Sequence, residues 1–147
     1  MRTLWLLLLA FLPFTASAQY NVDRLIMSGR VAVYYEDYVL GIQYFNQALS
    51  LKPYLYEPWQ LRAIAKFNLD DFAGAEFDAS KAIELNPYIP LLYDLRGISR
   101  IRQENYKGAI ADYEHAIRLE PTNQNFWYNR AVCRMEMKDY ERAQLEL

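Results

Sequence analysis

The chain contains one histidine, His115, and one cysteine, Cys133, two residue types that often serve as bases, nucleophiles or metal ligands. A metal site needs several ligands and a nucleophile needs a base beside it, so one residue of each type on separate predicted helices forms neither. Residues 34, 68 and 102 positions before Cys133 are Ser99, Ala65 and Val31. We therefore expect Cys133 to be a small core residue and His115 to lie on the outer face of a helix.

Other chemical signatures are also missing from the sequence. No paired carboxylates, phosphate-binding glycine loop or nucleophile–base pair stands out from the pattern of the chain. Most acidic residues fall at the starts of predicted helices or on solvated faces, where they offset the helix dipole. The sequence thus predicts a protein that is not an enzyme, with no cofactor and no metal.

Regularly spaced charges predict ion pairs instead. Three arginines are each followed sixteen residues later by an acidic residue: Arg62 and Asp78, Arg96 and Asp112, Arg130 and Glu146. The first unit of the pattern has Ser28 and Tyr44 at these places and lacks both charges together. This joint absence favours a pair between two helices over independent surface charges, whose pairing contributes only about 0–1 kcal/mol.

A 34-residue repeat positions these charges. Alanine–proline pairs recur at this interval: Ala48 and Pro53, Ala82 and Pro87, Ala116 and Pro121. Polar–aromatic dipeptides recur in register: Asp37-Tyr38, Asp71-Phe72, Asn105-Tyr106 and Asp139-Tyr140. So do small residues: Gly29, Ala63, Gly97 and Ala131. A fixed period of this length indicates a stack of similar units rather than one undivided core.

The pattern resembles the tetratricopeptide repeat over about residues 21–147. The resemblance implies an all-α, right-handed superhelical solenoid of antiparallel helix pairs, with about 3.5–4 repeats. The repeats would span residues 22–55, 56–89, 90–123 and, incompletely, 124–147. Two departures are Leu25, where the family prefers tryptophan or tyrosine, and Ala79, where the second helix usually carries an aromatic residue.

The helices follow from this register and from the prolines, which cannot continue a helix. We expect helices over 23–35, 38–51, 57–69, 72–85, 91–103, 106–119, 125–137 and 140–147. No segment alternates polar and apolar residues over the length of a strand, so we expect no sheet.

The N-terminus has the features of a secretory signal peptide. Arg2 is followed by the apolar run Leu4–Phe14 and by the small residues Ala16-Ser17-Ala18, which predicts cleavage of residues 1–18 and a mature start at Gln19. The run is shorter than the ~20 residues of a membrane-spanning helix, so we expect no stable membrane anchor after cleavage. The protein is expected to be exported: periplasmic or in the cell envelope if bacterial, otherwise secreted or luminal.

Charge argues against one class of partner. Cleavage would remove Arg2 and no acidic residue, so the net charge would change from −2 to −3. The charges are well mixed and no basic stripe is present, whereas nucleic-acid binding needs clustered lysine and arginine. We therefore expect a protein or peptide partner and no nucleic acid.

The resemblance implies that the first helix of each repeat lines a concave binding groove. The candidate groove residues are Arg30, Tyr34, Glu57, Gln60, Ile64, Asn68, Asp94, Ile98, Arg102 and Tyr128. One row of equivalent positions, namely Arg30, Ile64, Ile98 and Val132, is apolar in three of four repeats. The groove would be partly apolar, with Arg30, Arg102, Glu57 and Asp94 steering a partner segment. An alternative remains open, in which packing between successive first helices covers these aliphatic side chains.

Some members of the family clamp a terminal carboxylate with lysines and asparagines of the first helices. The matching positions here hold Ile26, Arg30, Leu61, Leu91 and Leu95. Only one of them is basic, so we do not expect binding of that type.

The leading interpretation is an exported adaptor that binds a segment of a partner protein. The alternatives are a self-associating structural array and the N-terminal repeat region of a longer multidomain envelope protein. The fourth repeat stops at Leu147 within its expected second helix. We therefore expect the natural chain to continue, or its open apolar end to serve in self-association.

Overall fold

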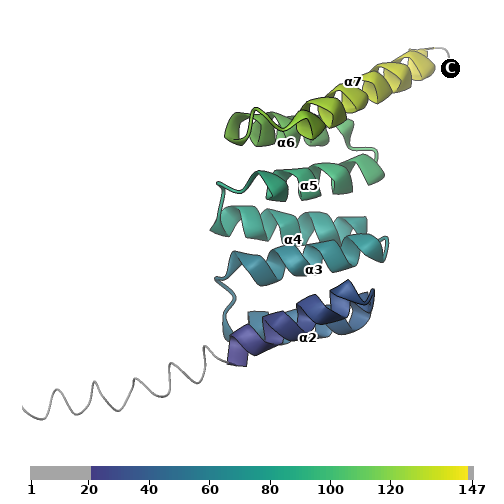
Figure 1. Cartoon of the computed structure of the whole chain (residues 1–147). Coiled ribbons are helices and arrows are strands. Elements are labelled where there is room, and N and C mark those ends of the chain that lie inside the picture. The colour runs from purple at the N-terminus through teal and green to yellow at the C-terminus, as the bar shows by residue number, and fades with distance from the viewer. Residues whose placement is uncertain (1–20, 146–147) are drawn as a thin grey trace, which may run out of the picture.

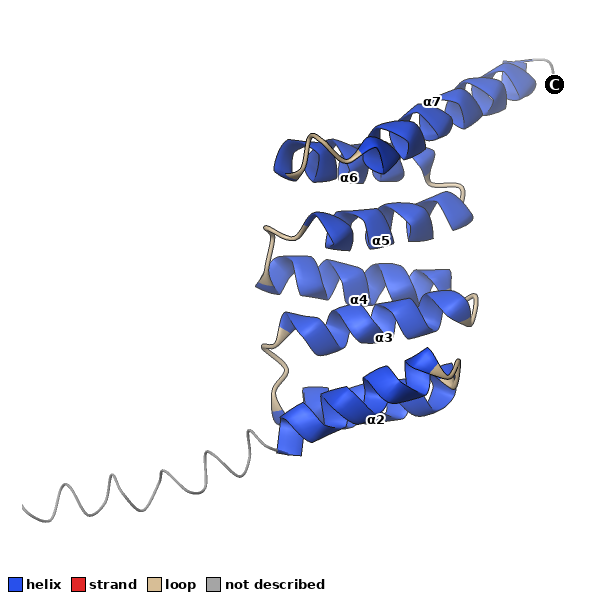
Figure 2. Cartoon of the chain, viewed as in Figure 1, coloured by secondary structure: helices blue, strands red, loops and turns tan. Residues whose placement is uncertain are grey.

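The computed structural model describes the backbone of residues 21–145 and the side chains of residues 21–138. A first helix over residues 21–34 is followed by α2 (Tyr38–Leu51), α3 (Tyr56–Asn68), α4 (Phe72–Leu85), α5 (Pro90–Arg102), α6 (Tyr106–Leu119) and α7 (Gln124–Leu145). Residues 21–145 contain no strand. The helices stack in chain order, so residue 21 and α7 lie at opposite ends of the stack (Figures 1 and 2). The predicted all-α solenoid is confirmed.

The turn inside each of the first three repeats has one design. Glu36, Asp70 and Glu104 adopt the left-handed conformation, with φ of 61°, 59° and 61°. The next residue caps the second helix: Asp37, Asp71 and Asn105 accept hydrogen bonds from the backbone N–H three residues later, at 2.9–3.1 Å. Such caps satisfy amide groups that a helix start otherwise leaves unpaired. The recurring polar–aromatic dipeptide is therefore a helix-capping signal.

The turns between repeats are also tied down. The backbone N–H after each second helix donates to the carbonyl of Ala48, Ala82 or Ala116, and a proline follows. An aromatic residue of the next helix then bonds that proline's carbonyl at 2.9–3.0 Å: Trp59 to Pro53, Tyr93 to Pro87 and Trp127 to Pro121. These bonds fix each repeat against the one before it.

Small and aromatic residues are matched across the two helices of a repeat. A Cβ atom on Gly29 would lie only 2.7 Å from Cζ of the buried Phe45, and one on Gly97 would lie 3.1 Å from the ring of Tyr113. Repeat 2 instead combines Ala63 with Ala79, both buried. A larger first-helix residue thus occurs where the second helix has no ring, which accounts for the departure at Ala79.

Two of the predicted ion pairs are present, and they are buried. Arg62 Nε and Nη2 donate to the two oxygens of Asp78, both at 2.8 Å. Arg96 Nη2 donates to Asp112 Oδ1 at 2.6 Å. The carboxylates are 0% and 1% exposed, so these are interior pairs and not the weak surface pairs considered as the alternative. The third predicted pair, Arg130 with Glu146, lies outside the described residues.

The fourth repeat differs from the expectation. Separate helices over 125–137 and 140–147 were expected, but α7 runs without a break from Gln124 to Leu145. In the other repeats a left-handed glutamate or aspartate makes the turn, and Lys138 stands at that position. A left-handed conformation costs a non-glycine residue about 1–2 kcal/mol, while Met137 and Lys138 are good helix formers. The helix therefore continues through the expected turn.

Candidate partner-binding face

The first helix of the chain, α3, α5 and α7 present the residues expected to bind a partner; we call their shared surface the first-helix face. α3 and α5 contact each other directly, so this surface is continuous across the middle repeats. Six of the ten expected residues are exposed: Arg30, Tyr34, Asn68, Ile98, Arg102 and Tyr128. The other four are half-buried: Glu57, Gln60, Ile64 and Asp94.

The apolar part of the face lies on α5 and α7. Ile98 is 37% exposed and Tyr128 is 70% exposed, and Leu91 is exposed beside them in the repeat pattern. Ile64 and Val132, in the same row as Ile98, are half-buried. Packing between first helices thus covers this row only in part, and aliphatic and aromatic groups stay accessible to a partner.

The charged residues of the face are already paired. Arg30 forms an ion pair with Glu57, with Nε 3.1 Å from Oε1, beside a cavity of about 280 Å³. The Arg102 guanidinium lies 4.6 Å from the centre of the Phe72 ring and 3.8 Å from Asp70. These contacts are exposed and exchangeable, so a partner can compete for the charged groups. Any steering field is weaker than four free charges would give.

Asp94 differs most from its expected role as a steering charge. Its Oδ1 atom is buried and, like the hydroxyl of Tyr113, has no hydrogen-bond partner among the described residues. Burial raises the pKa of the Asp94 carboxyl, and the nearby Tyr113 and Asn129 side chains offset the rise in part. The sequence pattern missed this burial because it depends on residues of α6 and α7, which are distant in the chain.

Replacing Asp94 by asparagine should stabilise the chain near neutral pH. A carboxyl with a raised folded pKa favours the folded state while protonated, and that advantage is lost as the pH rises through the folded pKa. The amide stays neutral, so Asp94→Asn should gain stability relative to the wild type as the pH rises from below 3.8 towards neutrality. Urea unfolding of both proteins over this range measures the difference. A difference independent of pH would contradict the assignment.

The two residues with the greatest intrinsic reactivity have structural roles. Cys133 is a free, buried cysteine, and burial raises the pKa of its thiol, so the reactive thiolate is disfavoured. His115 is exposed on α6 and stacks on the Tyr93 ring at 5.1 Å. Within the described residues no group of three or more histidine, cysteine or acidic side chains is arranged to hold a metal ion. None of the helices described is both long and apolar enough to span a membrane.

Comparisons with known proteins agree with this architecture. A family model described as Tetratricopeptide repeat matches residues 100–147. The TPR domain of Arabidopsis OM64 has a TM-score of 0.77 and 25% identity, with 80% of this chain and 98% of that chain covered. The chain is a tetratricopeptide-repeat array. No curated protein matches it.

Two further solved structures are similar to the tetratricopeptide-repeat array. The first TPR of Spaghetti (RPAP3), bound to the HSP90 peptide SRMEEVD, has a TM-score of 0.78 and 26% identity, with 81% of this chain and 94% of that chain covered. The Sgt2 TPR domain from Aspergillus fumigatus has a TM-score of 0.76 and 24% identity, with 82% of both chains covered. The second likeness concerns the fold alone.

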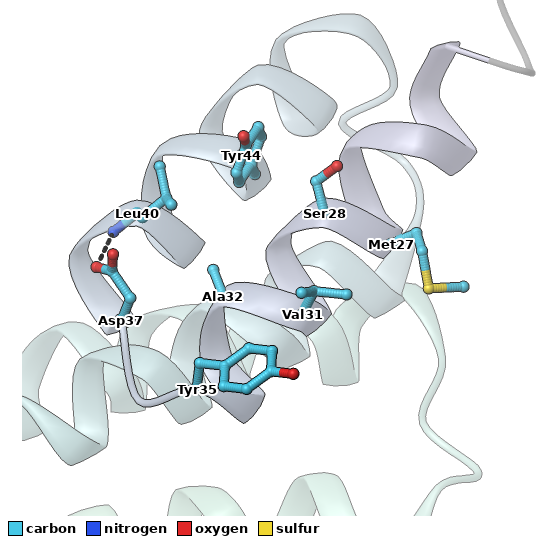
Figure 3. Close-up of a pocket in the computed structure, with 8 residues that line it drawn as sticks. All are labelled: Met27, Ser28, Val31, Ala32, Tyr35, Asp37, Leu40 and Tyr44. Carbon is cyan, nitrogen blue, oxygen red and sulfur yellow. Dashed lines mark hydrogen bonds between the residues drawn. The ribbon is translucent and has the colours of Figure 1, made fainter.

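The array also has a groove that the sequence interpretation missed. It lies at the outer side of repeat 1, where the side chains in Figure 3 surround a cavity of about 380 Å³ between the first helix and α2. The signal was available in the sequence, because Ser28 and Tyr44 stand where later repeats have the buried arginine and aspartate. Their absence was interpreted only as support for the ion pairs.

Proposed function

We propose that this array is a non-enzymatic scaffold that binds a segment of another protein along its first-helix face. The supporting observation is the accessible apolar group Leu91, Ile98 and Tyr128 on α5 and α7. Exposed aromatic and aliphatic side chains beside exchangeable charges are typical of protein interfaces. The similar RPAP3 domain was solved with a bound peptide, so the same architecture can hold an extended segment.

The chemistry of the face favours an apolar segment over an acidic tail. The positions that would clamp a carboxylate hold Ile26, Leu61, Leu91 and Leu95, and the one basic residue there, Arg30, is paired with Glu57. A segment that buries aliphatic or aromatic side chains against Ile98 and Tyr128 would gain about 25 cal/mol for each Å² of apolar surface buried. An acidic segment would find no matching positive cluster.

We further propose that the scaffold works outside the cytoplasm, after residues 1–18 are removed. The support is the order of Arg2, the apolar run Leu4–Phe14 and the small residues before Gln19. Mass spectrometry of the protein isolated from its host tests this step. A mature N-terminus other than Gln19 would contradict the assigned cleavage site.

Photo-crosslinking in the native host tests the binding face. A photoreactive residue at Ile98 should form a covalent adduct with one discrete protein. A residue at Glu84, exposed on α4, serves as the matched control on a second helix. Adducts that are the same at both positions, or none at Ile98, would contradict binding on the first-helix face.

A further inference from the structure

The outer face of repeat 1 carries an open groove between the first helix and α2. Two adjacent cavities, of about 380 and about 450 Å³, share Ser28 and Tyr44. Figure 3 shows that both helices supply the side chains around the first cavity, among them Val31 and Leu40. Both of these side chains are exposed. Terminal repeats usually end in a polar face, so this apolar groove indicates that a further element packs here.

The later repeats show what kind of element fits. There the equivalent face is covered by the second helix of the preceding repeat: α2 packs on α3, α4 on α5 and α6 on α7. Val31 is 50% exposed, whereas its equivalents Ala65, Ser99 and Cys133 are fully buried. The groove of repeat 1 is thus the seat of one helix that runs in the direction of the other second helices.

We propose that the apolar run Leu4–Phe14 fills this groove while residues 1–18 are still attached. Counting back 34 residues from α2 places the missing second helix at residues 4–17, a window that contains the whole run. Residues 18–20 then form the connection to the first helix, as residues 52–55 connect α2 to α3. Pro13 would end the helix near the close of its third turn.

The facing side chains are matched in this register. Between α4 and α5, Arg96 Nη1 donates to Ser80 Oγ at 3.3 Å and Arg100 Nε donates to Glu76 Oε1 at 2.7 Å. Two repeats earlier, 68 residues back, these positions hold the following residues: Ser28 opposite Leu12, and Ala32 opposite Leu8. Both polar pairs are replaced by a leucine facing a small residue.

The floor of the groove is suited to such an apolar helix. Tyr44 replaces the buried aspartates Asp78 and Asp112 of the next two repeats, so the carboxylate they provide is absent here. Two leucines can therefore be buried without stranding an unpaired charge. Removal of residues 1–18 would open the groove, which is separate from the first-helix face.

Thiol labelling tests this proposal in the full chain. Val31→Cys is introduced together with Cys133→Ser, because serine is already buried at the equivalent Ser99. The proposal predicts that maleimide labels the cysteine at position 31 at least roughly tenfold more slowly in residues 1–147 than in residues 19–147. Ala111→Cys, exposed on α6, should be labelled equally in both chains.

A second variant identifies the protecting segment. Leu8→Asp with Leu12→Asp should restore fast labelling in residues 1–147 and leave the helical circular dichroism of the array unchanged. Equal rates at position 31 in the two chains would overturn the proposal. Protection that survives the double substitution, or that increases with protein concentration as a second copy would cause, would also overturn it. Neither result bears on photo-crosslinking at Ile98.

Discussion

Replacing Asp112 by asparagine should lower the free energy of unfolding of the chain by about 3–5 kcal/mol. The carboxylate is 1% exposed and holds both Arg96 and Arg100, whose Nη1 donates to Oδ2 at 2.9 Å. Those arginines also reach Ser80 and Glu76 of α4, so Asp112 links three successive helices. Asparagine keeps the shape of the side chain but leaves two guanidinium groups in a largely buried site without a negative partner.

A matched exposed pair provides the control for Asp112. Glu114 lies two residues further on in α6 and contacts Arg134 at 3.4 Å, with both side chains substantially exposed. Glu114→Gln should change the free energy of unfolding by only about 0–1 kcal/mol. Urea unfolding followed by circular dichroism compares the two variants. An equal cost for the two would show that the buried ion pairs do not hold the repeats together.

The second large effect is expected at the contact between Phe45 and Gly29. Phe45 is fully buried, and Phe45→Ala should cost about 3–5 kcal/mol through lost contacts and a cavity. Gly29→Ala alone should cost about 1–3 kcal/mol, because the added methyl group overlaps the Phe45 ring and the ring has no free space to enter. Thermal and urea unfolding of the single variants measure both costs.

The double variant distinguishes a steric clash from an unrelated loss. With Phe45→Ala already present, Gly29→Ala should be neutral or stabilising, because alanine has a helix propensity about 1 kcal/mol better than glycine. The pair then reproduces Ala63 with Ala79 of repeat 2, which the array already accommodates. If the cost of Gly29→Ala were the same in both backgrounds, the two residues would not be coupled as the contact requires.

The repeat unit could be predicted from the sequence because its contacts recur at one interval. Spacing alone identified Arg62 with Asp78 and Arg96 with Asp112, since each pair lies within one helix pair. The burial of these pairs could not be predicted, because it comes from the helices of the neighbouring repeats. The same limit applies to Asp94, whose neighbours Tyr113 and Asn129 lie on α6 and α7.

Two other features show where the repeat pattern misleads. Asp139-Tyr140 fits the capping signal of the earlier repeats, yet α7 continues past it because Lys138 does not make the left-handed turn. At the other end, the absent arginine–aspartate pair of repeat 1 produces an open groove. Both differences occur in terminal repeats, where a position has a neighbour on one side only and the pattern gives no information about the other.

Binding of the protein captured at Ile98 tests the central claim most directly. A segment of that protein should be titrated against residues 19–147 in wild-type form and with Ile98→Asp, Tyr128→Ala or Phe77→Ala. Phe77 is a comparable exposed aromatic residue on α4, and the peptide SRMEEVD serves as a negative control. We predict that Ile98→Asp and Tyr128→Ala each weaken binding at least roughly tenfold, while Phe77→Ala has no effect. Unchanged affinity in the first two variants, or loss of binding only with Phe77→Ala, would contradict a partner site on the first-helix face.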